Sequence, residues 1–267
     1  MLTGCVTTRK EKYLTTNTPR EQKLMDIETE IKFGNYVDAI IQNEYMVLNN
    51  YELQQKAENI FYEIVDACDR KDMDFKLTIL NTNDKNAFAG PGGYVYITTG
   101  ILDMMTCKDE LAGVFAHEIG HICARHSIKS FYGKENAKVA IVLVSVGAAC
   151  LGAATTQDPS IGSDIGRAMA DISSLIAIIT VQGYSRQDEY QADALAVKYT
   201  KKLGYDPLKM IDLLKKMRKE REEEAGEKTN YSLLDSHPSP EDREENIKEQ
   251  IEYLSKGEEN EESISSN

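Results

Sequence analysis

The chain has 267 residues, a formal net charge of −13 at pH 7 and a sequence pI near 4.9. The length allows one large domain or two modest ones, and the acidic balance argues against a nucleic-acid partner, because nucleic-acid binding favours basic faces. The five cysteines, at positions 5, 68, 107, 123 and 150, contain no C-x-x-C pair, so we expect mostly free, buried thiols.

The N-terminus contains Leu-Thr-Gly-Cys at residues 2–5, which resembles a bacterial lipobox, a motif whose cysteine carries a lipid. A complete signal peptide would also have a basic and an apolar region, so we favour a shortened signal peptide over a coincidence. Val6 after the cysteine favours outer-membrane sorting, and residues 6–18 are polar and threonine-rich, as in a tether. We predict a lipobox remnant and tether over residues 1–18, with a lipid anchor at Cys5 on the periplasmic side of the outer membrane.

The first predicted elements are helices, followed by two strands. A capping box with proline at the first helical position, at residues 18–21, predicts a helix that ends at Gly34. Further helices are expected over residues 36–48 and 53–68, and strands over residues 75–80 and 94–98.

Residues 117–121 read H-E-x-x-H, which is a signature of zinc hydrolases. Apolar residues at three- and four-residue spacing predict a helix over residues 107–127, with Thr106 and Asp109 as a capping box. The two histidines are about 40° apart on one helical face, so both imidazoles can reach one cation. Glu118 lies one step round, where it can hold a metal-bound water and take its proton. The alternative is a helix that carries two surface histidines by chance.

His126 follows the same motif on the predicted helix. It lies nine residues after His117, about 180° round a continuous helix, so we expect it to face away from the metal. The spacing also fails the metzincin pattern, which needs a glycine before the third histidine. We predict a structural or supporting role for His126.

Residues 139–154 form an apolar run rich in small residues, and residues 175–181 form a shorter one. A membrane-spanning helix needs about 20 apolar residues, and the first run is shorter than that. We favour a buried or cleft-covering helical hairpin over a membrane span, although an exposed patch of this kind could touch a bilayer or a partner.

A third zinc ligand is expected after this apolar region, because a catalytic zinc has three protein ligands and an open position for water. Glu189 and Asp193 are four residues apart and share one face of a predicted helix, for which Gly204 is a plausible C-terminal cap. Glu189 could complete a set of two histidines and one glutamate, and Asp193 could hydrogen-bond the far nitrogen of a ligand histidine. Taken alone, this acidic pair could also be a solvated helix face.

The C-terminal part is predicted to be helical over residues 207–221 and 240–255, with a charged loop at 221–231 and a disordered acidic tail at 256–267. The fold class is therefore α+β and mostly helical, with a small β-sheet beside the H-E-x-x-H helix. We place a single metallopeptidase domain at residues 19–255.

The order of these motifs resembles the HtpX/Ste-type zinc metallopeptidase family, in its bacterial periplasmic lipoprotein branch. The matching stretches are H-E-I-G-H, R-x-x-E-x-x-A-D at 186–193, residues 86–97, Gly-Ile-Leu at 100–102, and Ser-His-Pro at 236–238 with Arg243 beyond it. The likeness covers roughly residues 20–255 and implies a zincin-like fold with one Zn²⁺ per chain.

The resemblance also implies roles for single residues. It makes His117, His121 and Glu189 the zinc ligands, Glu118 the general base and Asp193 their supporting partner.

Two more roles come from the C-terminal motif. In relatives the histidine equivalent to His237 lies beside the metal, so His237 would either stabilise the tetrahedral intermediate or latch the resting enzyme as an extra ligand. Arg243 would belong to the same cleft. The alternatives are an ordinary loop histidine and a solvated helix charge.

The strand predicted at residues 94–98 follows a turn rich in glycine and proline. We expect it to pair with an extended peptide through backbone hydrogen bonds, which would tolerate many sequences. The substrate-strand residues would be Asn86, Gly93, Tyr94, Val95 and Tyr96. The alternative is a purely structural hairpin.

The sequence therefore predicts a zinc-dependent endopeptidase that hydrolyses misfolded or misassembled cell-envelope proteins. Its expected partners are unfolded or misassembled protein substrates, the membrane through the lipid anchor, and outer-membrane assembly machinery. The runner-up is a chaperone-like envelope lipoprotein, latched by His237, that binds clients and rarely cleaves them. The intact residue set argues against a third reading, a structural protein with a decayed site.

Overall fold

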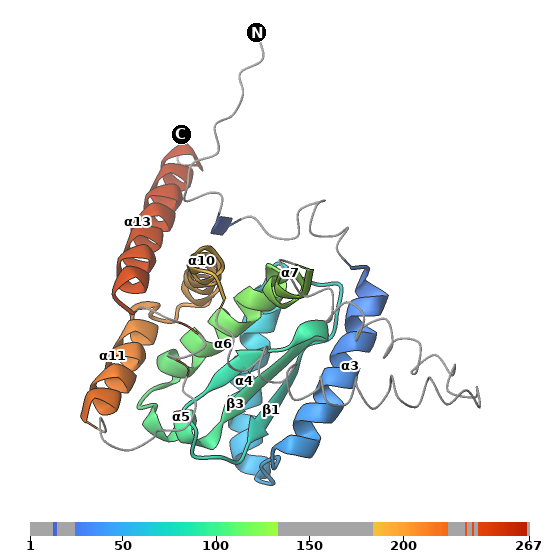
Figure 1. Ribbon diagram of the computed structural model, residues 1–267. Coiled ribbons are helices and arrows are strands. Elements are labelled where there is room, and N and C mark those ends of the chain that lie inside the picture. Colours follow the sequence, from blue (N-terminus) through green and yellow to red (C-terminus); the bar gives the residue numbers. More distant parts are fainter. Residues whose placement is uncertain are drawn as a thin grey trace, which may run out of the picture.

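The computed structural model describes residues 13–14, 25–132, 184–223, 233, 237 and 240–265 (Figure 1). In chain order its elements are α3 (Ile27–Glu44), α4 (Tyr51–Ala67), β1 (Lys76–Leu80), β2 (Ala87–Ala89), the 3₁₀ turn η1 (Pro91–Gly93), β3 (Tyr94–Thr98), α5 (Thr99–Met104), α6 (Lys108–Cys123), α7 (His126–Tyr132), α10 (Arg186–Lys202), α11 (Leu208–Glu223) and α13 (Pro240–Ser265). The prediction of a mostly helical α+β fold with a small sheet is confirmed.

Several predictions fall on other parts of the chain. The lipid anchor at Cys5, the helix start at residues 18–21 and the apolar runs at 139–154 and 175–181 lie outside the described residues. Within the described ranges, no helix combines the length and apolar composition needed to cross a membrane. The cysteines of these ranges, Cys68, Cys107 and Cys123, are free, and the first and last are buried.

The sheet has three strands in the order β1-β3-β2. β1 runs parallel to β3, with Leu77 opposite Val95, and β2 runs antiparallel to β3, with Phe88 opposite Tyr96. Both faces are covered, and the side chains alternate between them as the two-residue period of a strand requires. Tyr94 and Tyr96 pack towards α3, whereas Val95 and Ile97 pack towards α4 and α6.

Helix α3 continues through Gly34, where the sequence predicted a helix end. The helix begins after Asp26, whose carboxylate accepts a hydrogen bond from the backbone N–H of Thr29 at 2.9 Å. A Cβ atom at position 34 would lie 2.3 Å from the backbone oxygen of Pro91. The glycine therefore serves the close contact of α3 with η1, and the helix-stop prediction is wrong.

The predicted helix over residues 107–127 is two helices in the structure. α6 ends at Cys123, Arg125 adopts a left-handed backbone with φ of 55°, and α7 starts at His126. The predicted capping box is also wrong, because Glu110 accepts the hydrogen bond from the backbone N–H of Thr106 at 2.7 Å. The carboxylate of Asp109, which was the expected cap partner, accepts a hydrogen bond from the backbone N–H of Asp206 at 3.2 Å.

Two smaller elements, β2 and α5, have no counterpart in the sequence prediction, and α13 continues to Ser265, past the predicted end at residue 255. Helix α13 thus includes most of the residues that composition assigned to a tail. The domain boundary at residues 19–255 stays a prediction.

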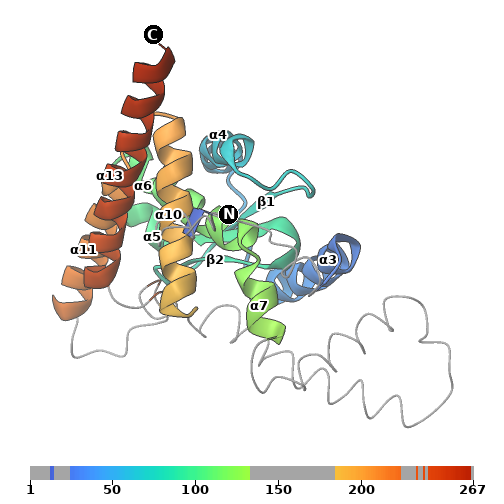
Figure 2. The same cartoon turned by 90° about the horizontal axis from the view of Figure 1, so that it is seen from above.

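Helix α6 forms the centre of the fold, and its residues 112–123 are all buried. α10 crosses α6 and also contacts α13, which lies beside it in the view from above (Figure 2). Gly120, inside the H-E-x-x-H motif, permits this contact, because a Cβ there would lie 3.0 Å from the backbone oxygen of Ala192. The missing side chain lets α10 approach the face of α6 that carries the two histidines.

Candidate metal centre

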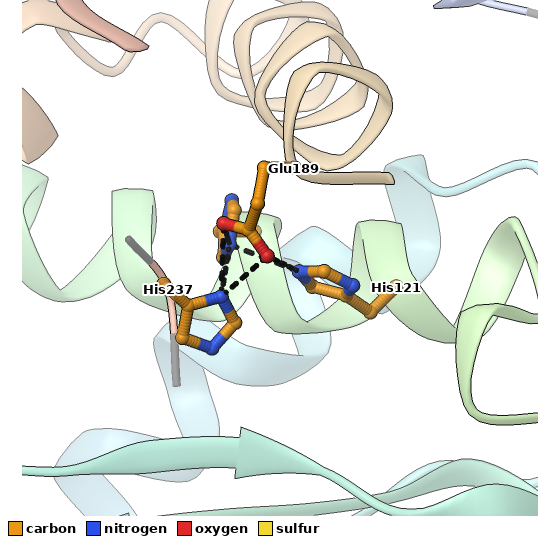
Figure 3. Close-up of side chains that lie close together, drawn as sticks. His121, Glu189 and His237 are labelled. Carbon is orange, nitrogen blue, oxygen red and sulfur yellow. Dashed lines mark hydrogen bonds and ion pairs between the residues drawn. The ribbon is translucent and has the colours of Figure 1, made fainter. Parts of the chain in front are cut away.

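Four side chains from three parts of the chain meet between α6 and α10. His117 and His121 come from α6, Glu189 from the first turn of α10, and His237 from the segment before α13. One ligand atom from each lies within 4.8 Å of the others, and all four side chains are buried. Figure 3 shows Glu189 pointing between His121 and His237, with its oxygens towards both rings.

His117 is held from both sides of its ring. Its Nε2 faces the cluster, 3.0 Å from Nε2 of His121, while its Nδ1 lies 3.0 Å from the Asp193 carboxylate. Arg243 in turn donates to both oxygens of Asp193, at 2.7 and 3.0 Å. A carboxylate at Nδ1 keeps the proton on that nitrogen, which leaves Nε2 free to bind a metal.

The electrostatics of the cluster favour a cation. Burial and the charge of Arg243 lower the pKa of His117, but its hydrogen bonds with Asp193 and Glu189 outweigh them and raise that pKa to about 9. Burial would raise the pKa of Glu189. The charge of His237 and the hydrogen bonds of Glu189 with His117 and His237 nevertheless hold that pKa well below its usual value. For Asp193 too, the charge of Arg243 and its hydrogen bonds outweigh burial and lower the pKa. Two buried, charged carboxylates therefore stabilise positive charge at this point.

His237 lies within the ligand cluster itself. Its Nδ1 is 2.8 and 3.0 Å from the two oxygens of Glu189 and 3.3 Å from Nε2 of His117. A nitrogen at this place is positioned as a fourth ligand beside His117, His121 and Glu189. This set of imidazole nitrogens and one carboxylate suits Zn²⁺, which binds such donors with tetrahedral geometry.

Glu118 points into the site without being part of the cluster. It is fully buried, and neither carboxylate oxygen has a hydrogen-bond partner among the described residues. Its Oε1 lies 3.7 Å from Nε2 of His237, and burial raises the pKa of the Glu118 carboxyl. A buried carboxylate without a donor is unusual and indicates a missing solvent or ion partner, which a hydrated metal ion would supply.

An apolar pocket adjoins the same side of α6. Its lining residues are Val114, His117, Glu118, Met210, Leu213, Leu214, Leu233 and Arg243. Apart from the site residues, this lining comes mainly from α6 and α11. The pocket therefore brings apolar surface next to the buried carboxylate.

His121 also has contacts on its ring face and at its far nitrogen. Nδ1 of His126 lies 2.9 Å from Nδ1 of His121, so the prediction that His126 faces away from the metal is wrong. Burial lowers the pKa of His126 to about 4. The ring of Tyr184 stacks on His121 with centroids 4.0 Å apart, and its hydroxyl lies 3.3 Å from Oγ of Ser127. The sequence analysis did not predict a role for Tyr184. The one signal in the sequence is its position directly before Ser185, the N-terminal cap of α10.

The predicted substrate strand is the central strand of the sheet. Tyr94, Val95 and Tyr96 lie in β3, whose backbone is paired with β1 on one side and β2 on the other. Backbone pairing of these residues with an added peptide is therefore excluded, and that prediction is wrong. The backbone of Asn86 is likewise occupied, since its N–H donates to Oγ1 of Thr98 and its oxygen accepts from the backbone N–H of Thr98.

Gly93 ends the turn η1, which connects β2 to β3. Gly93 has a φ of 90° and lies beneath the backbone oxygen of Asp74, where a Cβ would be 2.2 Å away, so its role is structural. β2 is paired only with β3 among the described residues and contacts α6. All three residues of β2 are buried, so this strand belongs to the core of the fold.

Comparison with known proteins adds independent information. The sequence model of Peptidase family M48 matches residues 49–251. The beta-barrel assembly-enhancing protease of Escherichia coli is 24% identical over 227 residues, covering 82% of this chain and 43% of that protein. The mitochondrial metalloendopeptidase OMA1 of Saccharomyces cerevisiae is 28% identical over 240 residues, covering 82% of this chain and 62% of that protein. The metalloprotease YcaL of Escherichia coli is 29% identical over 173 residues, covering 64% of this chain and 59% of that protein. The chain thus spans about half the length of the relatives it matches.

Proposed function

The chain belongs to peptidase family M48, and on that basis we propose that it is a zinc-dependent endopeptidase acting on misfolded or misassembled proteins of the bacterial cell envelope. The observation that carries the proposal is the buried cluster of three histidines and one glutamate beside Glu118, a carboxylate without a hydrogen-bond partner in the described part of the chain. This combination of ligands and an adjacent free base is what metal-assisted hydrolysis of a peptide bond requires.

The proposed mechanism divides the work among a few residues. His117, His121 and Glu189 would hold the zinc, which when bound polarises a carbonyl and lowers the pKa of water to about 7. Glu118 accepts a proton from the attacking water on its carboxylate and delivers it to the nitrogen of the leaving amine. Asp193, fixed by Arg243, keeps the proton on Nδ1 of His117 throughout.

We further propose that the protein acts in the cell envelope. One relative is named as a beta-barrel assembly-enhancing protease, which supports a role in the cell envelope and a link to outer-membrane assembly. Lipidation of Cys5 in the Leu-Thr-Gly-Cys motif would hold the domain on the periplasmic side of the outer membrane. Mass spectrometry of Cys5-containing peptides from membrane fractions would test the anchor.

The enzymatic proposal is tested with unfolded casein and the purified, zinc-loaded chain. We expect cleavage that disappears after treatment with a chelator and returns when Zn²⁺ is added back. Cleavage that persists in the metal-free protein would contradict the proposal. Added Mg²⁺ is the matched control, because it prefers oxygen ligands and should not restore activity.

His237 favours a second candidate function, a latched protein that binds clients and rarely cleaves them. Its Nδ1 sits at 2.8 Å from Glu189, inside the ligand cluster, where it would occupy the position that water needs. Replacing His237 with alanine is expected to raise casein cleavage, because it opens that position. Zinc content, measured in parallel, should stay at one ion per chain.

The direction of the change decides between the two roles of His237. If His237→Ala cleaves faster than the wild type, the residue is a latch. If His237→Ala loses activity while keeping its zinc, the histidine acts on the substrate and the latched function is rejected.

A further inference from the structure

His126 lies against a metal-ligand candidate because α6 stops early. A continuous helix would place His126 about 180° from His117, on the far side of α6. Instead Arg125 takes a left-handed backbone with φ of 55°, and the chain turns into α7 at His126. The turn brings Nδ1 of His126 to 2.9 Å from Nδ1 of His121.

This turn is strained and is held in place by distant residues. A non-glycine residue in the left-handed region costs about 1–3 kcal/mol and persists only where the surroundings enforce it. The Arg125 guanidinium is buried and donates to Glu30 of α3 at 2.7 Å, and Glu30 also receives a bidentate bond from Arg70 at 2.9 Å. Backbone strain of this kind is typical of functional sites, so we infer that the position of His126, which the turn determines, has a function.

The hydrogen bonds on the other side of His126 fix the direction of its contact with His121. Nε2 of His126 lies 3.1 Å from Oε1 of Gln191 and 3.3 Å from Oδ1 of Asp188. A carboxylate can only accept, so Nε2 of His126 carries the proton and Nδ1 is left as an acceptor. Nδ1 of His121 must then be the donor.

We propose that His126 is a positioning residue for the metal site, accepting a hydrogen bond from Nδ1 of His121 so that Nε2 of His121 is free to bind the ion. The inference rests on the proposed zinc function. It gives the two histidines of α6 different partners, since His117 has a carboxylate at Nδ1 and His121 has a neutral imidazole. The face of His121 is covered by Tyr184, so its ring is fixed in orientation as well as in tautomer.

Two amide variants separate this role from simple filling of space. In His126→Asn the amide oxygen is attached where Nδ1 is attached in histidine, so an acceptor for His121 is retained. In His126→Gln the amide lies one bond further out, near the position of Nε2, and cannot reach Nδ1 of His121. The control is Ile128→Val, since Ile128 is fully buried in α7 but packs with the α3 cluster, away from the metal site.

The measurement is Zn²⁺ affinity, determined by competition with a chromogenic chelator on the full chain. We expect His126→Gln to bind Zn²⁺ about 10–100-fold more weakly than the wild type, the usual effect of losing such a partner. His126→Asn should lose distinctly less, and Ile128→Val should match the wild type. Wild-type affinity in His126→Gln, or an equal loss in both amide variants, would overturn the proposal.

A second measurement needs no variant. In the zinc-loaded wild-type protein, ¹⁵N-resolved NMR of the imidazoles should show the proton of His126 on Nε2 and that of His121 on Nδ1. A proton on Nδ1 of His126 would contradict the assignment even if a variant failed to fold. If the wild type binds no Zn²⁺, the proposed function fails, whereas a zinc-binding wild type with unaffected His126→Gln rejects only the role of His126.

Discussion

Replacing Glu118 with glutamine should lower the rate of casein cleavage by about 10²–10⁴-fold, the contribution typical of a positioned general base. Glutamine keeps the shape of the side chain but cannot accept the proton of the attacking water. The four clustered ligand candidates do not include Glu118, so the zinc content of the variant should equal that of the wild type. Initial rates at equal zinc loading are the measurement.

The same substitution should leave the free energy of unfolding unchanged or higher. Glu118 is fully buried and lacks a hydrogen-bond partner in the described part of the fold, and burial raises the pKa of its carboxyl. A neutral amide removes the desolvation penalty of the charged form. Urea denaturation of both proteins checks this, and Glu118→Gln that keeps full activity, or that unfolds more easily, would contradict the assignment.

Replacing Arg243 with leucine should lower the free energy of unfolding by about 3–5 kcal/mol, the usual effect of leaving one member of a buried ion pair alone. Arg243 is 2% exposed and Asp193 is fully buried, and their two hydrogen bonds are 2.7 and 3.0 Å long. Without Arg243 the Asp193 carboxylate would keep only its contact with His117 among the residues that the structure describes. Urea denaturation of the zinc-free protein measures the loss without a contribution from metal binding.

Two further variants serve as controls for Arg243. Lys248 pairs with Glu244 at 2.6 Å on the exposed part of the same helix, and Lys248→Ala should leave the free energy of unfolding nearly unchanged, because solvent screens this pair. Replacing Arg243 and Asp193 together with leucine should recover much of the lost stability, because no unpaired charge remains. If Arg243→Leu is no worse than Lys248→Ala, the buried pair does not stabilise the fold.

The sequence predicts the parts of the site that depend on local periodicity. Four-residue spacing places His117 and His121 on one face of α6 and Glu189 and Asp193 on one face of α10, and the structure has both arrangements. The alternation of residues 94–98 predicts β3. Each of these inferences needs only the geometry of a single helix or strand.

The predictions that were wrong depend on contacts between elements that are far apart in the sequence. Whether β3 is a central or an edge strand depends on β1 and β2, which no pattern within β3 encodes. Gly34 reads as a helix stop, but it is required by the contact of α3 with Pro91. His126 was misplaced because the break at Arg125 is enforced by Glu30, which lies 95 residues away in the sequence.

The order of the site residues along the chain has a consequence for shortened forms of the protein. His117, His121 and Glu189 lie in α6 and α10, whereas His237 and Arg243 lie near the start of α13. Loss of the segment from residue 224 onward would leave three candidate ligands and Glu118 in the chain, but would remove the fourth nitrogen and the arginine that binds Asp193. A cut between α11 and α13 would therefore uncover the metal centre without removing its set of three ligands.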